Sequence, residues 1–179
     1  FKYCHSLETI KIPSSVTFID KECFCNSFSL TSIEYEGEIN GNSIKECYSL
    51  RLLPKIKSLE IGNFERYKSL STIQLVNLKN IPPSCFNQCL SLSEIDILTK
   101  CKEIGIFAFK HCISLRNIRI PKKVNKINDG AFYGCVSLEK IIIENKDIKI
   151  GYDAFGECSS LKEIIIGNKK IDEYKFEVN

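Results

Sequence analysis

The chain contains no methionine and no tryptophan, and only two of its 179 residues are histidine. It opens at Phe1, in the middle of a phrase that recurs later, so we expect it to be a fragment of a longer chain. No apolar run approaches the roughly 18 residues that a membrane-spanning helix needs, and no signal peptide precedes the first phrase. Any membrane contact is therefore expected to be peripheral.

The chain also lacks a strong excess of charge. Its 25 Lys and Arg residues face 22 Asp and Glu, which leaves a net charge of +3, spread evenly along the chain. A nucleic-acid-binding protein needs a dense basic face, so we expect no nucleic-acid partner. With 44% hydrophobic and 26% charged residues, the composition is typical of a globular protein.

One phrase fills the sequence. Aligned on its leucine, it gives eight copies at steps of 20 to 23 residues, and a serine precedes each leucine. Phe stands six residues before the leucine in every copy except the third, which has Ile44, and Ile or Leu stands three residues after it. The leucines are Leu7, Leu30, Leu50, Leu70, Leu92, Leu115, Leu138 and Leu161. Such a period predicts coils that stack into a solenoid and share one continuous core.

The pattern within one copy predicts the shape of a coil. Leu-x-x-Ile-x-Ile is typical of a short strand whose alternate residues point inward, and turn-forming residues lead into a one-turn helical piece that carries the Phe. We expect one domain over residues 1–179: a slightly curved, right-handed, β-rich array of parallel strands with short helical turns. The two 20-residue copies at roughly 31–70 predict an irregular coil, where Lys55 interrupts an inward column. The tail at 171–179 shows no obvious cap.

These columns resemble a known family. The pattern Leu-x-x-Ile-x-Ile-Pro, then Val-x-x-Ile, then Ala-Phe-x-x-Cys-x-Ser is similar to the BspA-like leucine-rich repeats of bacterial surface proteins and parasitic protists, and the wording rich in Lys, Ile and Asn resembles the protist branch. The resemblance covers the whole chain. It implies a leucine-rich-repeat solenoid that binds other proteins, often at a cell surface, and it implies no catalytic residues.

The ten cysteines follow the repeat. Nine occupy columns that hold Ala, Val, Ser or Tyr in other copies, so we interpret them as small buried hydrophobic residues. Disulfides between neighbouring coils remain an alternative, because equivalent Cα atoms are expected about 4.8 Å apart. Cys23 and Cys25 have the wrong spacing for a zinc site, and we expect no metal and no cofactor. Cys25 stands where other copies have Lys110 and Tyr133, so it is expected to be the most exposed thiol.

Nothing in the sequence indicates an enzyme. The serine column recurs eight times, which favours hydroxyls that satisfy nearby backbone groups over a catalytic serine. His5 and His111 lie four coils apart and cannot meet in a rigid array. His111 is adjacent to Cys112, but neighbours along the chain point in different directions. We find no phosphate-binding loop, no dinucleotide motif and no His-Glu-x-x-His pattern.

The variable positions lie on the outward face of the strands. A rigid scaffold with variable outward residues is what a recognition surface requires, although a merely solvated face has the same pattern. Ile142 and Ile165 are apolar outward residues in neighbouring strands, which favours a binding patch or a covering segment. The candidate partner-binding residues are Lys11, Glu34, Gln74, Asp96, Arg116, Arg119, Ile142 and Ile165.

A second candidate surface is a row of lysines just after the later strands. It would attract an acidic partner or anionic lipid headgroups, or simply protect a sheet edge. The row consists of Lys100, Lys122, Lys123, Lys146, Lys169 and Lys170.

The sequence therefore predicts a non-enzymatic protein-interaction module that self-associates into a homo-oligomer. A cell-surface adhesin for matrix or host proteins is the main alternative, and the lysine row is the second. Free cysteines and the absence of Asn-x-Ser/Thr sites favour the cytoplasm over the cell surface.

Overall fold

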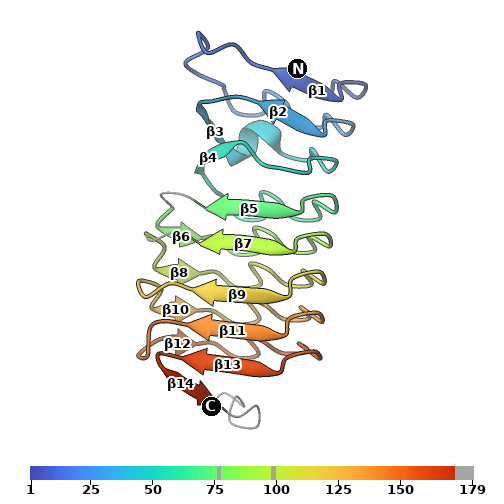
Figure 1. Ribbon diagram of the computed structural model, residues 1–179. Coiled ribbons are helices and arrows are strands. Elements are labelled where there is room, and N and C mark those ends of the chain that lie inside the picture. Colours follow the sequence, from blue (N-terminus) through green and yellow to red (C-terminus); the bar gives the residue numbers. More distant parts are fainter. Residues whose placement is uncertain (76–77, 98–99, 172–179) are drawn as a thin grey trace.

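The computed structural model describes residues 1–75, 78–97 and 100–171. The chain winds into a β-solenoid of about seven turns with almost no helix. Figure 1 shows the strands stacked in chain order from one end of the molecule to the other. The leucine-rich-repeat solenoid expected from the sequence is confirmed. We number the coils one to eight by the eight leucines.

Every coil except the third places one strand on the front of the stack (Figure 1). Its inward residues pair with the same column in the next coil: Ile118 with Ile141, and Ile141 with Ile164. All pairs between successive front strands are parallel. The front strands are β1 (Thr9–Lys11), β2 (Ser32–Glu34), β5 (Thr72–Leu75), β7 (Glu94–Ile97), β9 (Asn117–Ile120), β11 (Lys140–Ile143) and β13 (Glu163–Ile166).

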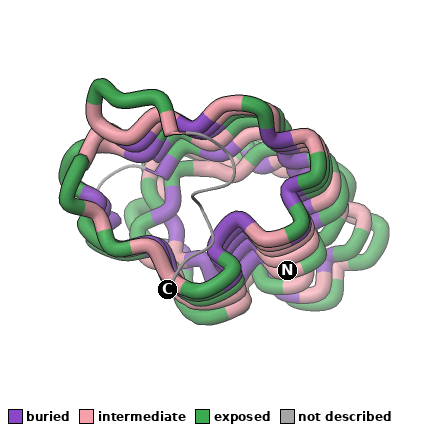
Figure 2. The backbone as a smooth tube through the Cα atoms, turned by 90° about the horizontal axis from the view of Figure 1, so that it is seen from below, coloured by how far each residue is buried: buried purple, intermediate pink, exposed green. Residues whose placement is uncertain are grey.

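Shorter strands carry the chain back along the opposite side. Four of them form one parallel sheet in the order β12-β10-β8-β6, and two form a separate pair. The sheet consists of β6 (Asn80–Ile81), β8 (Glu103–Ile104), β10 (Lys126–Ile127) and β12 (Lys149–Ile150), and the pair of β3 (Glu38–Asn40) and β4 (Lys55–Ser58). Figure 2, seen along the stack, shows successive coils superimposed, so each column of the sequence becomes a row of equivalent residues.

The third coil is irregular, as its shortened copy predicts. Its front strand is reduced to a single bridge between Leu52 and Thr72. The chain then crosses to the return side, where Lys55 is exposed and Ile56 is buried in β4. The pairing of β3 with β4 also shifts register after Ile39. Consequently β1 and β2 form one front sheet, separate from the sheets that follow.

The far end of the stack is closed by a hairpin. Strand β14 (Lys169–Ile171) runs antiparallel to β13, with Lys170 opposite Ile165. Gly167 makes the connecting turn with a φ of +61°, a left-handed conformation that suits glycine. The uncapped tail that the sequence predicts at 171–179 lies, after Ile171, outside the described residues.

The Phe column lies in a segment of consecutive hydrogen-bonded turns. Only the third coil has a short helix there among the described residues, the 3-10 helix η1 (Gly41–Ile44). The rings stack from coil to coil, with centroids 5.2 to 5.4 Å apart from Phe64 to Phe155. Ile44 interrupts this stack in the third coil.

Residues near the Phe column adopt the left-handed region, two residues before it in six coils and two residues after it in all eight. The residue two places after the Phe column has a φ between +54° and +69° in every coil, although only one of the eight is glycine. These residues are Tyr3, Asn26, Glu46, Arg66, Gln88, His111, Gly134 and Glu157. Inter-coil hydrogen bonds hold this geometry. The Phe64 amide donates to the Cys85 carbonyl (2.8 Å). The Arg66 amide likewise donates to the Asn87 carbonyl (2.8 Å).

Candidate interaction surface

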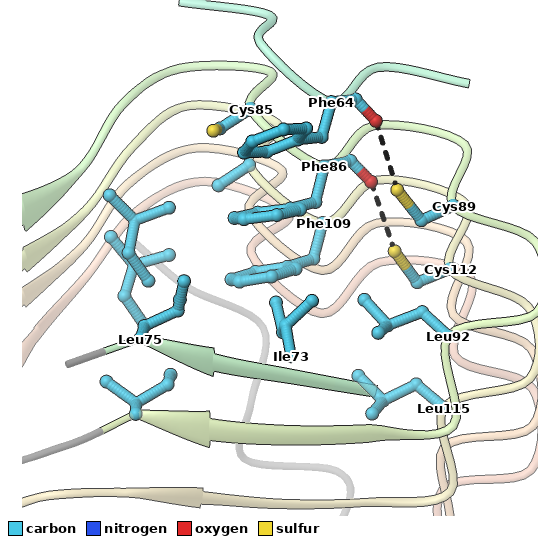
Figure 3. Close-up of a cluster of buried hydrophobic side chains, with 14 of the residues drawn as sticks. Phe64, Ile73, Leu75, Cys85, Phe86, Cys89, Leu92, Phe109, Cys112 and Leu115 are labelled. Atoms are coloured by element: carbon cyan, nitrogen blue, oxygen red, sulfur yellow. Dashed lines mark hydrogen bonds between the residues drawn. The ribbon is translucent and has the colours of Figure 1, made fainter. Parts of the chain in front are cut away.

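The main cysteine column faces the core and donates hydrogen bonds between coils. The Cys89 thiol lies 3.2 Å from the Phe64 carbonyl oxygen, and the Cys112 thiol lies 3.3 Å from that of Phe86 (Figure 3). Where the column has serine, Ser27 donates to the Phe1 carbonyl at 3.0 Å. The same thiol bond is made by Cys47, Cys135 and Cys158. The column thus carries a buried hydrogen-bond donor, which goes beyond the hydrophobic role predicted from the sequence.

Burial makes these thiols unreactive. Burial raises the pKa of Cys89 to about 12 and raises that of Cys112 well above its ordinary value. Because the thiolate is the nucleophilic form, neither side chain is poised for covalent chemistry. All ten cysteines are free thiols in the structure, not disulfides.

The prediction that Cys25 is the most exposed thiol is wrong. Its side chain is only 4% exposed, and its sulfur accepts a hydrogen bond from the Asn26 amide group at 3.2 Å. The equivalent residues Lys110 and Tyr133 are half-buried, whereas the small Cys25 is buried. The partly exposed thiols are Cys4 and Cys23.

The two histidines do not assemble a catalytic group. The His5 ring stacks on Phe28 with a centroid distance of 5.1 Å. The His111 ring meets Tyr133 edge-on at 5.9 Å, while the neighbouring Cys112 thiol is directed to the Phe86 carbonyl. In the serine column, Ser114 donates to the Leu90 carbonyl at 2.6 Å, as expected for a structural hydroxyl.

A groove of about 880 Å³ crosses the front of the stack. Its floor is the outward face of β5, β7, β9 and β11, and residues 52–55 of the third coil form a wall at one end. The wall exists because the third coil leaves the front after Leu52, whose side chain is 57% exposed. Pro54 has no amide hydrogen to continue a strand, which accounts for the departure of the chain at this point.

The charges in the groove are arranged by strand. On β9 and β11, Arg119 lies 2.7 Å from Glu144 and Lys140 lies 2.8 Å from Glu163. The Arg119 guanidinium, through its hydrogen bond, lowers the pKa of the Glu144 carboxyl. On β7 both outward residues are acidic, Glu94 and Asp96, and both are exposed.

The hydrogen-bonded sheet that forms the floor of the groove is interrupted between β7 and β9. The two strands belong to different hydrogen-bonded sheets, one of β5 and β7 and the other of β9, β11, β13 and β14. Ile95 of β7 is half-buried and lines the groove, whereas its equivalents Ile73 and Ile118 are each only 3% exposed. The groove therefore combines the two exposed carboxylates of β7 with aliphatic side chains from β11 and the wall, namely Ile142, Leu52 and Leu53.

The structure brings together four of the eight residues predicted for partner binding: Gln74, Asp96, Arg119 and Ile142 all line the groove. Lys11 and Glu34 lie on the other side of the irregular coil, where they pair with each other at 3.3 Å.

Two further predicted residues flank the groove. Arg116 is exposed just before β9, and Ile165 lies opposite Ile142 on β13. The wall residues Leu52 and Leu53 were missed. Leu53 stands in an inward column that elsewhere marks the core, whereas Leu52 stands in an outward column that is polar in the other coils.

The lysine row is split by the structure. Lys100, Lys122, Lys123 and Lys146 are exposed in turns after the front strands. Lys169 and Lys170 instead lie in β14 at the closed end of the stack. The Lys122 backbone amide donates to the Glu144 carboxylate at 3.0 Å, so an acidic group lies within this row.

Within the part of the chain that the structure describes, no group of three or more His, Cys, Asp or Glu side chains is arranged to hold a metal ion. The same residues include no helix that is long and apolar enough to cross a bilayer.

Comparison with known proteins gives a family and a fold. The family model described as "BspA type Leucine rich repeat region (6 copies)" matches residues 1–97 and 79–178. Among curated proteins, none matches the chain.

Two solved structures resemble this one. A leucine-rich repeat protein from Bacteroides ovatus is 27% identical, with a TM-score of 0.56, over 93% of this chain and 57% of that one. A leucine rich cell surface protein from Faecalibacterium prausnitzii is 22% identical, with a TM-score of 0.51, over 94% of this chain and 62% of that one. The second likeness concerns the fold alone, and the chain spans less than two thirds of either protein.

Proposed function

Because the chain belongs to the BspA-type leucine-rich repeat family, a family of protein-interaction scaffolds, we propose that it binds a partner protein in the groove on its front face. The observation that carries the proposal is the groove itself, of about 880 Å³ with residues of four strands on its floor. Ligand sites are typically concave, with apolar surface and a few placed polar groups. Leucine-rich-repeat solenoids are typically non-enzymatic.

The charged and apolar residues of the floor support this proposal over a merely solvated face. Gln74, Asp96, Arg119 and Ile142 occupy the same outward column in successive coils, and each differs in chemistry from its neighbours. The rigid backbone presents a different side chain at each step of about 4.8 Å. Such a surface distinguishes partners by the order of the residues in their sequences.

The test is quantitative affinity capture with two matched variants. Gln74→Arg with Asn117→Arg places two long side chains on the groove floor, and Asn80→Arg with Asn125→Arg places them on the return side. All four positions are exposed, so we expect both variants to fold. Proteins that bind the native chain and the return-side variant, but not the groove variant, would identify the partner. Equal capture by both variants would contradict the proposal.

Self-association and cellular location are further proposals. We propose that the protein associates end to end or face to face, which light scattering tests; a monomer at high concentration would contradict it. We propose that the protein lies in the cytoplasm, a reducing compartment, and the ten free thiols support this proposal. The alternative is a cell-surface adhesin, and the capture experiment should therefore include both cell extract and extracellular matrix proteins.

A further inference from the structure

We infer that the partner enters the groove as an extended segment in which a Lys or Arg stands two positions from an aliphatic residue. This inference rests on the proposed function and specifies the chemistry of the partner. It follows from the charges that remain unpaired in the groove, from the apolar surface beside them, and from the dimensions of the floor.

The unpaired charge in the groove is negative on balance. The basic groups on β9 and β11 are already neutralised, Arg119 by Glu144 and Lys140 by Glu163. Glu94 and Asp96 form no ion pair with any residue of the described ranges 1–75, 78–97 and 100–171. In the wall, Lys55 also has no ion pair within these ranges, and its ammonium group donates to the Glu36 carbonyl at 3.3 Å. An acidic partner meets this single lysine, whereas a basic partner meets two free carboxylates on one strand.

Apolar surface lies close to those carboxylates. Between Glu94 and Asp96, Ile95 faces inward and packs against the core, but it stays half-buried where β7 and β9 belong to separate sheets. On β11, Ile142 is a half-buried outward residue that lines the groove. Leu52 and Leu53 add aliphatic surface in the wall next to β5. A Lys or Arg of the partner alone would leave the apolar surface of the groove exposed to water. An aliphatic side chain on the same face of the segment covers this surface and excludes water from the ion pair, which strengthens the electrostatic attraction.

The dimensions of the floor suit an extended segment. The four strands of the floor, about 4.8 Å apart, span roughly 15 Å, which is the length of about five extended residues. Alternate residues of an extended segment face the same way, which allows one side chain to pair with β7 while another reaches Leu52 or Ile142.

A random display library of twelve-residue peptides tests the inference without knowledge of the natural partner. Peptides selected on the native chain are compared on two variants with equal loss of negative charge. Glu94→Gln with Asp96→Asn removes the groove carboxylates. Glu8→Gln with Asp147→Asn removes one Glu and one Asp that are exposed and do not line the groove.

We expect the selected peptides to share a Lys or Arg two positions from Leu, Ile or Val. Binding of a synthetic peptide with that pattern should weaken about three- to tenfold on the groove variant, as expected for two partly screened ion pairs, and should be unchanged on the control variant. The affinity should also fall as salt is added.

Three results would overturn the inference. Acidic peptides that lose binding on Arg119→Gln with Lys140→Gln would reverse the charge of the partner but leave the groove as the binding site, so the proposed function would stand. The inference would also be contradicted by a selection that yields no peptides. The same holds for peptides that bind equally well to the native chain and to Glu94→Gln with Asp96→Asn. Peptides insensitive to Gln74→Arg with Asn117→Arg as well would also count against the groove itself.

Discussion

The Tyr67 hydroxyl donates a hydrogen bond to the Ile44 carbonyl of the preceding coil, and it accepts one from the Cys47 amide at 2.9 Å. The two residues are the exceptions in their columns: Ile44 stands where other coils have Phe, and Tyr67 stands where most have Cys. The Tyr67 ring lies edge-on to Phe64 at 5.2 Å and is almost fully buried. The larger side chain of one column therefore fills the space left by the smaller side chain of the other.

This compensation predicts non-additive substitutions. Tyr67→Cys should lower the free energy of unfolding by about 2–4 kcal/mol because it leaves a cavity, and Ile44→Phe should lower it by about 1–3 kcal/mol because it overfills the site. The double variant restores the pattern of the other coils, so its loss should be smaller than the sum by about 1–3 kcal/mol. Urea unfolding of the four proteins measures the coupling. Simple additivity would show that the two sites do not share one space.

The buried thiols predict a loss of stability at alkaline pH. Burial raises the pKa of Cys89 from its ordinary value of 9.0 to about 12. Between these values the folded protein keeps a proton that the unfolded chain releases, so stability falls as pH rises, by about 1.4 kcal/mol per pH unit for this thiol. Cys89→Ser should make the fall between pH 9 and 12 shallower by this amount. Chemical denaturation at several pH values provides the measurement, and identical slopes in the two proteins would argue against the raised pKa.

The left-handed residues predict that glycine stabilises the turns. Gln88 has a φ of +60°, a conformation that costs a residue with a Cβ atom about 1–2 kcal/mol. Gln88→Gly should therefore be more stable than Gln88→Ala, by about 0.5–1 kcal/mol after the greater flexibility of the unfolded glycine chain is counted. Thermal unfolding compares the two variants.

The reverse substitution serves as the control. Gly134 occupies the equivalent position with a φ of +69°, and a Cβ there would lie 2.3 Å from the His111 ring. Gly134→Ala should destabilise the protein. Equal stability of the Gln88 variants would mean that the turn imposes no such strain.

The wall of the groove predicts a separation between binding and stability. Leu52 is 57% exposed and lines the groove, so Leu52→Ser should weaken partner binding while changing the free energy of unfolding by less than about 0.5 kcal/mol. Ile61→Ser is the matched control, because Ile61 is 74% exposed and does not line the groove. Titration of the captured partner against each variant tests the difference. A similar loss for both would point to general surface hydrophobicity.

The accessibility of the thiols predicts a stepwise titration. In protein prepared without reductant from its native source, Cys4 and Cys23 should react with Ellman's reagent before denaturation, since they are the partly exposed thiols. The other eight should react only after unfolding, to give ten in all. Four or fewer thiols after denaturation would show that the cysteines are cross-linked, and would favour an oxidising location.

The repeat allowed the core to be predicted from the sequence, because inward columns depend only on local periodicity. Leu115, Phe109 and Ile118 follow the pattern and are all buried. The weak coil at Lys55 was also predictable, since missing residues and a charge in an inward column leave a strand incomplete.

The groove was only partly predictable. Outward residues such as Asp96 follow from strand alternation, but the wall at Leu52 depends on where the third coil leaves the sheet. The exposure of Ile95 depends on the separation of two neighbouring sheets, which no local pattern encodes. The hydrogen-bond donor role of the cysteines could be recognised only once the structure gave the positions of the Phe carbonyls. One signal in the sequence is that Cys, Ser and Tyr, which occur in this one column, can all donate a hydrogen bond.

The backbone amides of the Phe-bearing segments point toward the coil that follows. The coils therefore complete one another in the order in which they are synthesised. Each such amide, for example that of Phe64, finds its acceptor in the coil that follows, which the ribosome makes later. The thiol or hydroxyl in the cysteine column of each later coil, in turn, donates to a carbonyl of the coil before it, as Cys89 does to Phe64 and Ser27 to Phe1. In a growing chain, the backbone amides of the Phe-bearing segment in the last coil therefore have no acceptor yet. Each new coil supplies the acceptors for these amides and adds amides of its own that wait for the coil after it.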